Sequence, residues 1–167
     1  MGLSNLLGVL SSYAGGAASN APPNTEQDFQ NVSAAIPQQH LASGLAQAFH
    51  SSQTPPFPEM LSTLFSHSNP DQKAGILGRL LSAAGPAGIG ALGGLIPGLS
   101  PNSTQLNPQQ SAQVPPSAVR QLAEQAQSTN PSIVEEASSF YSQHPQVVQA
   151  LGAGALALIM SHVSQRL

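Results

Sequence analysis

Apolar residues recur along this chain at spacings of three and four, which place them on one face of an α-helix. β-branched and aromatic residues never alternate with polar ones over a useful length, so no strand is predicted. A last helix is predicted from about Pro145 to near the C-terminus. The earlier short helices are marked by Phe29, Val32 and Ile36; Leu41, Leu45, Ala48 and Phe49; Leu61, Leu64 and Phe65; Ile76, Leu77, Leu80, Leu81 and Ala84; Val119, Leu122 and Ala126; and Ile133, Ala137, Phe140 and Tyr141. The pattern predicts an all-α protein built from short helices.

Prolines and asparagines mark the expected starts of several helices. An asparagine side chain can accept a hydrogen bond from a free backbone N–H at a helix start, and proline at the first helical position sacrifices no hydrogen bond. Three of the prolines follow asparagine, at Asn69, Asn107 and Asn130. The prolines at plausible first-turn positions are Pro37, Pro70, Pro108, Pro131 and Pro145.

The N-terminal segment is predicted to be an amphipathic helix. Leu3, Leu6, Leu7 and Leu10 lie on one helical face, which would dock on the body of the protein or on a partner. A secretory signal needs early positive charge, but the first basic residue is Lys73, so no such signal is recognised. Leu6 stands where a myristoylation motif requires serine or threonine. A cytoplasmic location is therefore the default expectation.

Two stretches rich in proline, serine, asparagine and glutamine are predicted to be linkers, at residues 15–24 and 100–117. They divide the chain into an N-terminal helix (1–14), a first helical unit (25–99) and a second one (118–167). The segments that begin at Ile36 and Leu64 resemble those that begin at Val114 and Ser139. This likeness suggests two similar helical units packed with pseudo-two-fold symmetry. The alternative is that short helices begun by proline resemble one another through composition alone.

Residues 80–99 form an uncharged run of the length that a membrane span requires. The run holds six glycines and two prolines, however, and its longest predicted helix, Pro86–Ile96, is too short to cross a bilayer. We therefore predict a packing element with Ile89, Leu92, Ile96 and Leu99 near one face. Its Gly90 and Gly94 form a G-x-x-x-G pair that allows a second backbone to approach. A mobile glycine-rich loop and a membrane-inserting hairpin are the alternatives. The later apolar run, Val147–Met160, fits a buried core helix.

Charge is scarce in this chain. Charged residues make up 7% of the sequence, against about 25% in a typical soluble domain, and the net charge is −3. The four basic residues are too few to follow a phosphate backbone, so nucleic-acid binding is not expected. Repulsion between copies is correspondingly weak, which favours self-association. Cysteine is absent from the sequence, which excludes disulfides and thiolate metal sites.

No motif of a known chemistry occurs in the sequence. The nucleophile elbow, the phosphate-binding loop, the dinucleotide fingerprint and the zinc-protease helix are all missing. The five histidines are scattered, with no pair spaced to bind a metal on one helix. Glu135 and Glu136, like Glu26 and Asp28, fall in predicted first turns, where the helix dipole favours negative charge. We therefore predict no catalytic residue, no cofactor and no metal.

The opening "MGLSNLLGVL" and the centre rich in glycine, alanine and leucine resemble the YidB-like family of small bacterial proteins. Members of that family often begin Met-Gly-Leu and continue into a leucine-rich helix. The resemblance covers about a quarter of the chain, and Asn5 stands where the family usually has an acidic residue. It implies a helical fold and a bacterial source, and it carries over no activity and no functional residue.

These observations lead to two hypotheses about function. The first is a non-enzymatic structural or interaction protein that self-associates, or binds a protein partner, through apolar helix faces. The residues predicted to carry that contact are Leu3, Leu6, Leu7, Leu10, Ile89, Gly90, Leu92, Gly94 and Ile96. The alternative is a peripheral membrane or lipid-binding protein that uses the N-terminal helix and residues 80–99.

Overall fold

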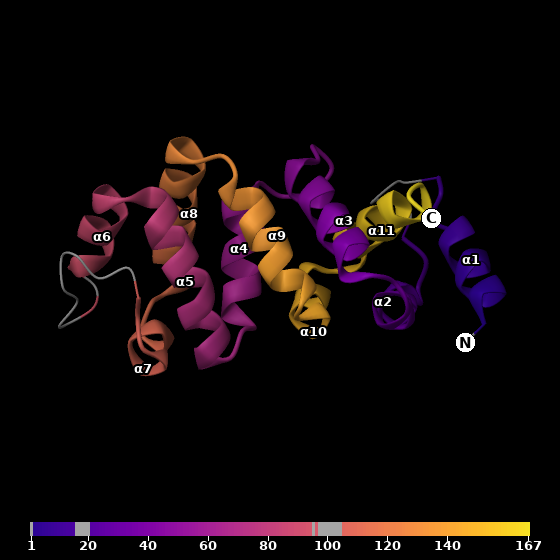
Figure 1. Cartoon of the computed structure of the whole chain (residues 1–167), viewed down its shortest axis with the longest axis horizontal. Coiled ribbons are helices and arrows are strands. Elements are labelled where there is room, and N and C mark those ends of the chain that lie inside the picture. Colours follow the sequence, from indigo (N-terminus) through magenta and orange to yellow (C-terminus); the bar gives the residue numbers. More distant parts are fainter. Residues whose placement is uncertain (1, 16–20, 95, 97–104) are drawn as a thin grey trace. The chain divides into compact units, whose positions relative to one another are not determined.

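The computed structural model describes residues 2–15, 21–94, 96 and 105–167. The described part of the chain contains helices and no strand, which confirms the all-α prediction. The chain divides into two compact units (Figure 1). We call residues 1–56 together with 138–167 the split unit, and residues 57–137 the central unit. This division differs from the predicted one, because the C-terminal segment packs on N-terminal helices instead of forming a unit of its own.

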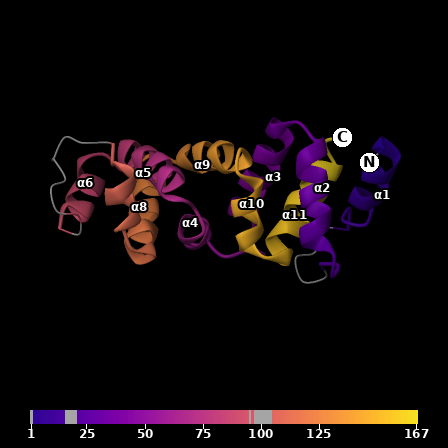
Figure 2. The same ribbon diagram turned by 90° about the horizontal axis from the view of Figure 1, so that it is seen from below.

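The split unit is formed by helices from both ends of the sequence. Its last helix, α11, packs against α3, α2 and α1, and α10 also contacts α2 (Figure 2). Phe29, Leu45, Tyr141 and Leu156 are fully buried in its core. The elements are α1 (Leu3–Ser11), α2 (Thr25–Ala35), α3 (Gln38–His50), α10 (Pro145–Val148), the 3₁₀ turn η2 (Gln149–Leu151) and α11 (Ala153–Ser164).

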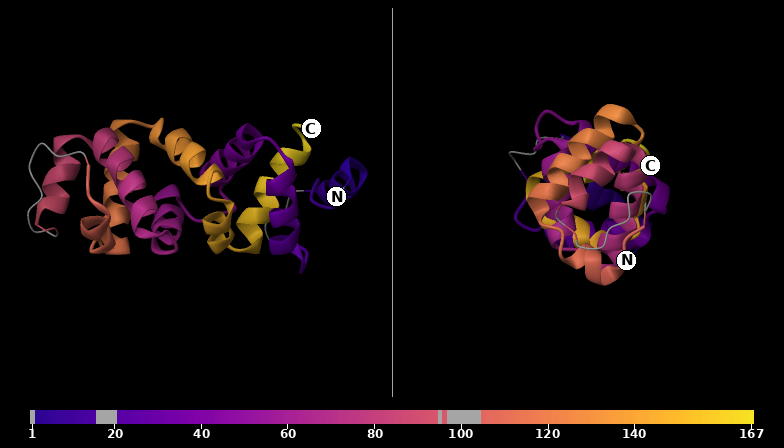
Figure 3. Two further views of the ribbon diagram at one scale, coloured as in Figure 1. Left: turned by 60° about the horizontal axis from the view of Figure 1, so that its bottom comes forward. Right: turned by 90° about the vertical axis from the view of Figure 1, so that its left-hand side faces the viewer.

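The central unit is a continuous stretch of sequence. Helix α8 packs along both α4 and α5, and α6 and α7 pack against α5. Figure 3 shows these helices in two further views, coloured by sequence. Leu64, Phe65, Leu80 and Leu81 are fully buried in this core. The elements are α4 (Phe57–Ser66), α5 (Pro70–Ala84), α6 (Pro86–Gly93), α7 (Pro108–Ala112) and α8 (Pro116–Thr129); α9 (Ile133–Ser142) begins here and ends in the split unit.

Three of the five predicted proline starts are confirmed. Pro70, Pro108 and Pro145 each occupy the first turn of a helix. Asn69 and Asn107 form complete capping boxes with Gln72 and Gln110, each pair exchanging two hydrogen bonds at the helix start. Helices α7 and α8 both begin within residues 100–117, which were predicted to be a linker.

The other two predicted proline starts are wrong in detail. Pro37 precedes α3 as its N-cap instead of lying inside its first turn. Asn130 ends α8, and its side chain accepts hydrogen bonds from Ser132 instead of capping a helix that begins at Pro131. Helix α9 starts at Ile133 instead. Asn130 and Pro131 therefore form a turn between two helices, because an asparagine side chain can hydrogen-bond to the backbone of a turn as well as to a helix start.

Two glycines in the left-handed region separate consecutive helices. Gly85, with φ of +69°, ends α5 and precedes Pro86, which lies in the first turn of α6. Gly152, with φ of +88°, lies inside the run Val147–Met160, which was predicted to be a single helix. Because L side chains rarely adopt this conformation, the run is divided there into the η2 turn and α11.

Candidate functional site

The N-terminal helix is docked on the split unit by part of the face that the sequence predicts. Leu6 and Leu10 are buried, whereas Leu7 remains 56% exposed. The side chain of Leu3 lies outside the described residues. Helix α1 contacts α2 and α11, so its buried leucines face the same chain. Only Leu7 of the described α1 leucines is available to a partner while the helix stays docked.

Three apolar side chains of residues 86–94 and 96 lie inside the central unit, and Leu99 lies outside the described residues. Ile89, Leu92 and Ile96 are buried, and α6 packs against α5 and α8. Helix α6 ends at Gly93, earlier than the predicted end at Ile96. These three side chains are therefore used by the fold and are closed to a second molecule in this arrangement.

In α6, the glycine that lies close to neighbouring helices is Gly88, and not Gly90 or Gly94 of the predicted pair. Gly90 and Gly94 are exposed, and a Cβ atom added at either would meet nothing within 4 Å. A Cβ at Gly88 would lie 2.5 Å from Ala84 Cβ and 2.7 Å from Leu122 Cδ1. The G-x-x-x-G pair thus has no neighbour within the described residues, and Gly88 is the position that requires glycine.

A polar contact that the sequence analysis missed secures the end of α1. The Tyr13 hydroxyl donates to Asp28 Oδ2 at 2.7 Å and lies 3.3 Å from Thr25 Oγ1. Tyr13 and Thr25 are both buried. Burial is the main cause that raises the pKa of Tyr13, and the neighbouring Asp28 carboxylate adds to it. The sequence does contain a sign of this contact. Tyr13 follows directly after an apolar helix, and a tyrosine there can pack its ring and still hydrogen-bond through its hydroxyl.

Helices α3 and α11 cross closely, and a histidine bonds across the crossing. A Cβ added at Gly44 would lie 3.0 Å from both Ile159 Cγ2 and the Ile159 carbonyl oxygen. Beside it, Ser43 Oγ lies 3.0 Å from His162 Nε2. Burial lowers the pKa of His162, and nearby Arg166 lowers it further. The serine and the histidine thus form a hydrogen bond between the two helices.

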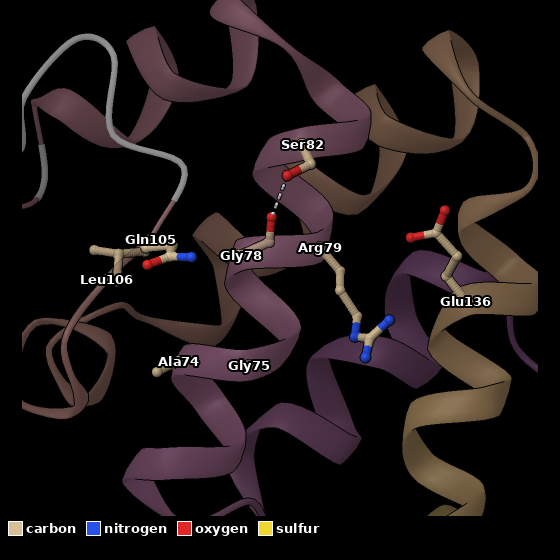
Figure 4. A pocket seen from close by; sticks show the side chains of 8 residues that line it. All are labelled: Ala74, Gly75, Gly78, Arg79, Ser82, Gln105, Leu106 and Glu136. Carbon is tan, nitrogen blue, oxygen red and sulfur yellow. Dashed lines mark hydrogen bonds between the residues drawn. The ribbon is translucent and has the colours of Figure 1, made fainter.

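A hollow with a volume of about 490 Å³ lies along α5 in the central unit. Its base is formed by Ala74, Gly75 and Gly78, whose side chains are small or absent and leave the space above α5 empty (Figure 4). Gln105 and Leu106 lie on one side of α5, and Arg79 extends on the other side toward Glu136 of α9 (Figure 4). The hollow therefore has hydrogen-bonding groups and charges at its edges and little apolar enclosure.

Two smaller hollows lie within the split unit, and both are lined mainly by uncharged polar side chains. The first, about 330 Å³, lies between the end of α1 and α11 and includes Gln47, Ser161 and His162. The second, about 350 Å³, lies between α2 and α10 and includes Gln30, Ser33 and Gln149. Amide and hydroxyl groups of this kind suit neutral hydrogen-bonding partners and offer no strong charge to an ionic ligand.

Within residues 2–15, 21–94, 96 and 105–167, no group of three histidine or acidic side chains is placed to hold a metal ion. Over the same residues, no helix combines the length and the apolar character needed to cross a bilayer. Comparison of the chain with protein-family models, with curated proteins and with solved structures finds no match. The resemblance to the YidB-like family therefore stays a prediction.

Acidification from pH 7.5 to pH 5.5 is expected to destabilise the split unit. Burial lowers the pKa of both His144 and His162 below the ordinary value of 6.5. As the pH falls through 6.5, the unfolded chain binds protons that the folded chain does not yet accept, so folding stability decreases. The melting temperature should therefore fall over this range, and it should fall less in His144→Gln/His162→Gln. An equal fall in both proteins would contradict this assignment.

Proposed function

We propose that this chain is a non-enzymatic interaction protein that self-associates. The observation that carries the proposal is a surface poor in charge, with 7% charged residues and a net charge of −3. The described hollows add amide, hydroxyl and small side chains to that surface. Copies of such a protein repel one another weakly, and their polar side chains can hydrogen-bond across a contact.

Burial limits which of the predicted contact residues can reach a second copy. Leu6, Leu10, Ile89, Leu92 and Ile96 are buried within one chain, so they reach a second copy only if α1 or α6 leaves its place. Leu7, Gly90 and Gly94 are exposed and need no such change. The proposed contact therefore uses either these exposed positions or an exchanged helix.

Light scattering coupled to size-exclusion chromatography tests the proposal. We expect the measured mass to rise with protein concentration in the wild-type chain. The variant Leu7→Asp should shift this rise to higher concentration if α1 is used in its docked position. A mass that stays at that of one chain across the whole concentration series would overturn the proposal.

The competing class is a peripheral membrane protein, and exposed Leu7 on α1 is the observation in its favour. An amphipathic helix can insert one apolar face at a bilayer surface. Flotation with neutral and anionic vesicles separates the two classes. Recovery of the wild-type chain with vesicles, lost in Leu7→Asp, would favour the membrane over a second copy.

A further inference from the structure

Helix α1 is a discrete element held in place through one face. Leu6, Leu10 and Tyr13 are buried and follow one another at helical spacing, while Leu7, at the edge of that face, is exposed. Its contacts include α2 and α11 of the split unit. An amphipathic helix laid into a groove between two others is a recurrent mode of peptide recognition, in which a few apolar side chains anchor the ligand. Helix α1 lies against α2 and α11 of its own chain, and we call the surface of these two helices that it covers the groove.

The groove also contributes a specific polar partner to its helix. Asp28 and Thr25 lie in the first turn of α2, and both face the Tyr13 hydroxyl. The donor to Asp28 lies beyond the last turn of α1, so it fixes where along the groove the helix ends. Leu6, Leu10 and Tyr13 thus form a three-point pattern, with two apolar anchors and one phenol, that the groove distinguishes from a generic apolar helix.

The position of α1 depends on these side chains rather than on continuity with the next helix. Residues 14–24 separate Tyr13 from α2, and the described part of that stretch contains no helix. Helix α1 begins at Leu3, and its N-cap residue, Gly2, provides no side-chain cap. An identical helix on another molecule could make the same three contacts, because none of them depends on the covalent connection. The covalent connection only raises the local concentration of the attached helix.

We infer that the groove between α2 and α11 is a helix-binding site, and that its ligand besides the chain's own α1 is α1 of a second copy. This inference rests on the proposed self-association and names the surface through which it occurs. A second copy is the occupant because its sequence supplies the two leucines and the phenol that the groove already accommodates. At low concentration the attached helix outcompetes the other one, and exchange between chains becomes favourable as concentration rises.

A peptide-binding experiment on the full-length chain tests the inference. The probe is a fluorescently labelled synthetic peptide of residues 1–15, titrated with wild-type chain and with the variant Leu6→Asp/Leu10→Asp. Because the variant's own helix no longer docks, its groove is free. We expect the variant to bind the peptide at least about tenfold more tightly than the wild type does, since the wild-type groove is occupied by an attached competitor.

Three controls make the result specific. A peptide that itself carries both aspartate substitutions should not bind, and a peptide with Tyr13→Phe should bind more weakly because it lacks the donor to Asp28. The chain variant Ser4→Asp changes an exposed position on the opposite face of α1, so its own helix should stay docked and it should bind the peptide as the wild type does. Circular dichroism checks that Leu6→Asp/Leu10→Asp remains folded, and Leu6→Ala/Leu10→Ala replaces it if it does not.

The outcomes separate this inference from the proposed function. No peptide binding to a folded variant overturns the inference, and so does equal binding to variant and wild type, which would place the peptide elsewhere. Self-association of the wild type without peptide binding leaves the proposed function standing and removes this surface. Peptide binding by the variant, with a wild type that stays a single chain at every concentration, supports the groove as a helix-binding site and overturns the proposed self-association.

Discussion

Replacing Gly88 with leucine should lower the free energy of unfolding of the central unit by about 1–3 kcal/mol, the typical cost of overpacking a core. A Cβ at this position would lie 2.5 Å from Ala84 Cβ, and that atom is fixed to the backbone of α5. The nearby Leu122 Cδ1 is the end of a flexible side chain and can move aside. Helix α6 must therefore shift away from α5 to admit any larger residue.

The matched control is Gly90→Leu, two residues further along the same helix. Gly90 is exposed with no heavy atom near its Cβ direction, and leucine is a better helix former than glycine. We expect this variant to be as stable as the wild type or more stable by up to about 1 kcal/mol. Urea unfolding monitored by circular dichroism measures both. Equal destabilisation by the two variants would show that the segment accepts no side chain at all, against the packing described for α6.

Replacing Phe65 with alanine should be more costly, at about 3–5 kcal/mol. Phe65 is fully buried on α4, which packs along α8, so the substitution leaves a cavity that the neighbouring helices fill only in part. The Lys73 ammonium also lies 5.1 Å from the centre of the ring, and its attraction to the aromatic face is lost as well. Thermal and urea unfolding should both show the loss.

Two further variants separate the cavity from the cation. Phe65→Leu keeps most of the buried volume and should cost less than alanine does. Lys73→Ala removes only the cation and should cost about 0.5–1 kcal/mol. Phe65→Ala with the stability of Lys73→Ala would mean that the ring contributes little through burial, and the assigned core of the central unit would be wrong.

Local features of this fold were predictable because their causes lie within a few residues. Each of the two capping boxes has the same local sequence: an asparagine, then a proline, and a glutamine three residues after the asparagine. The stop at Gly85 is likewise local, because glycine followed by proline both ends one helix and starts the next. Asn130 shows the limit of such reasoning. The same two residue types close a turn there, and the choice depends on how the flanking helices pack.

The choice among the glycines of residues 85–94 was not predictable from local pattern. Gly90 and Gly94 have the spacing of a close-packing pair, yet Gly88 is the one that faces another helix. Which face of α6 turns inward depends on α5 and α8, and α8 begins more than twenty residues later in the sequence. Amphipathic periodicity identified the buried residues Ile89 and Leu92 correctly, because apolar side chains report burial directly.

The polar contacts and the division into units were missed for a related reason. Ser43 and His162 are separated by more than a hundred residues, and the sequence around one residue gives no indication that it contacts the other. The prediction of units in chain order assumed that neighbouring helices pack together. In the structure, α11 packs on α3 and α2, so the last helix completes the core begun by the first ones.

That arrangement has a consequence for the order in which the chain becomes structured during its synthesis. The central unit is continuous in sequence, so all of its contacts are available once residues 57–137 have left the ribosome. Leu41 and Leu45 of α3 are made earlier, but α11, which packs against this helix, is made only after the whole central unit. Until α11 has been made, the apolar side of α3 lacks this partner. That side of the nascent chain therefore stays uncovered by α11 while the central unit is synthesised, and it is open to contacts with other molecules during this time.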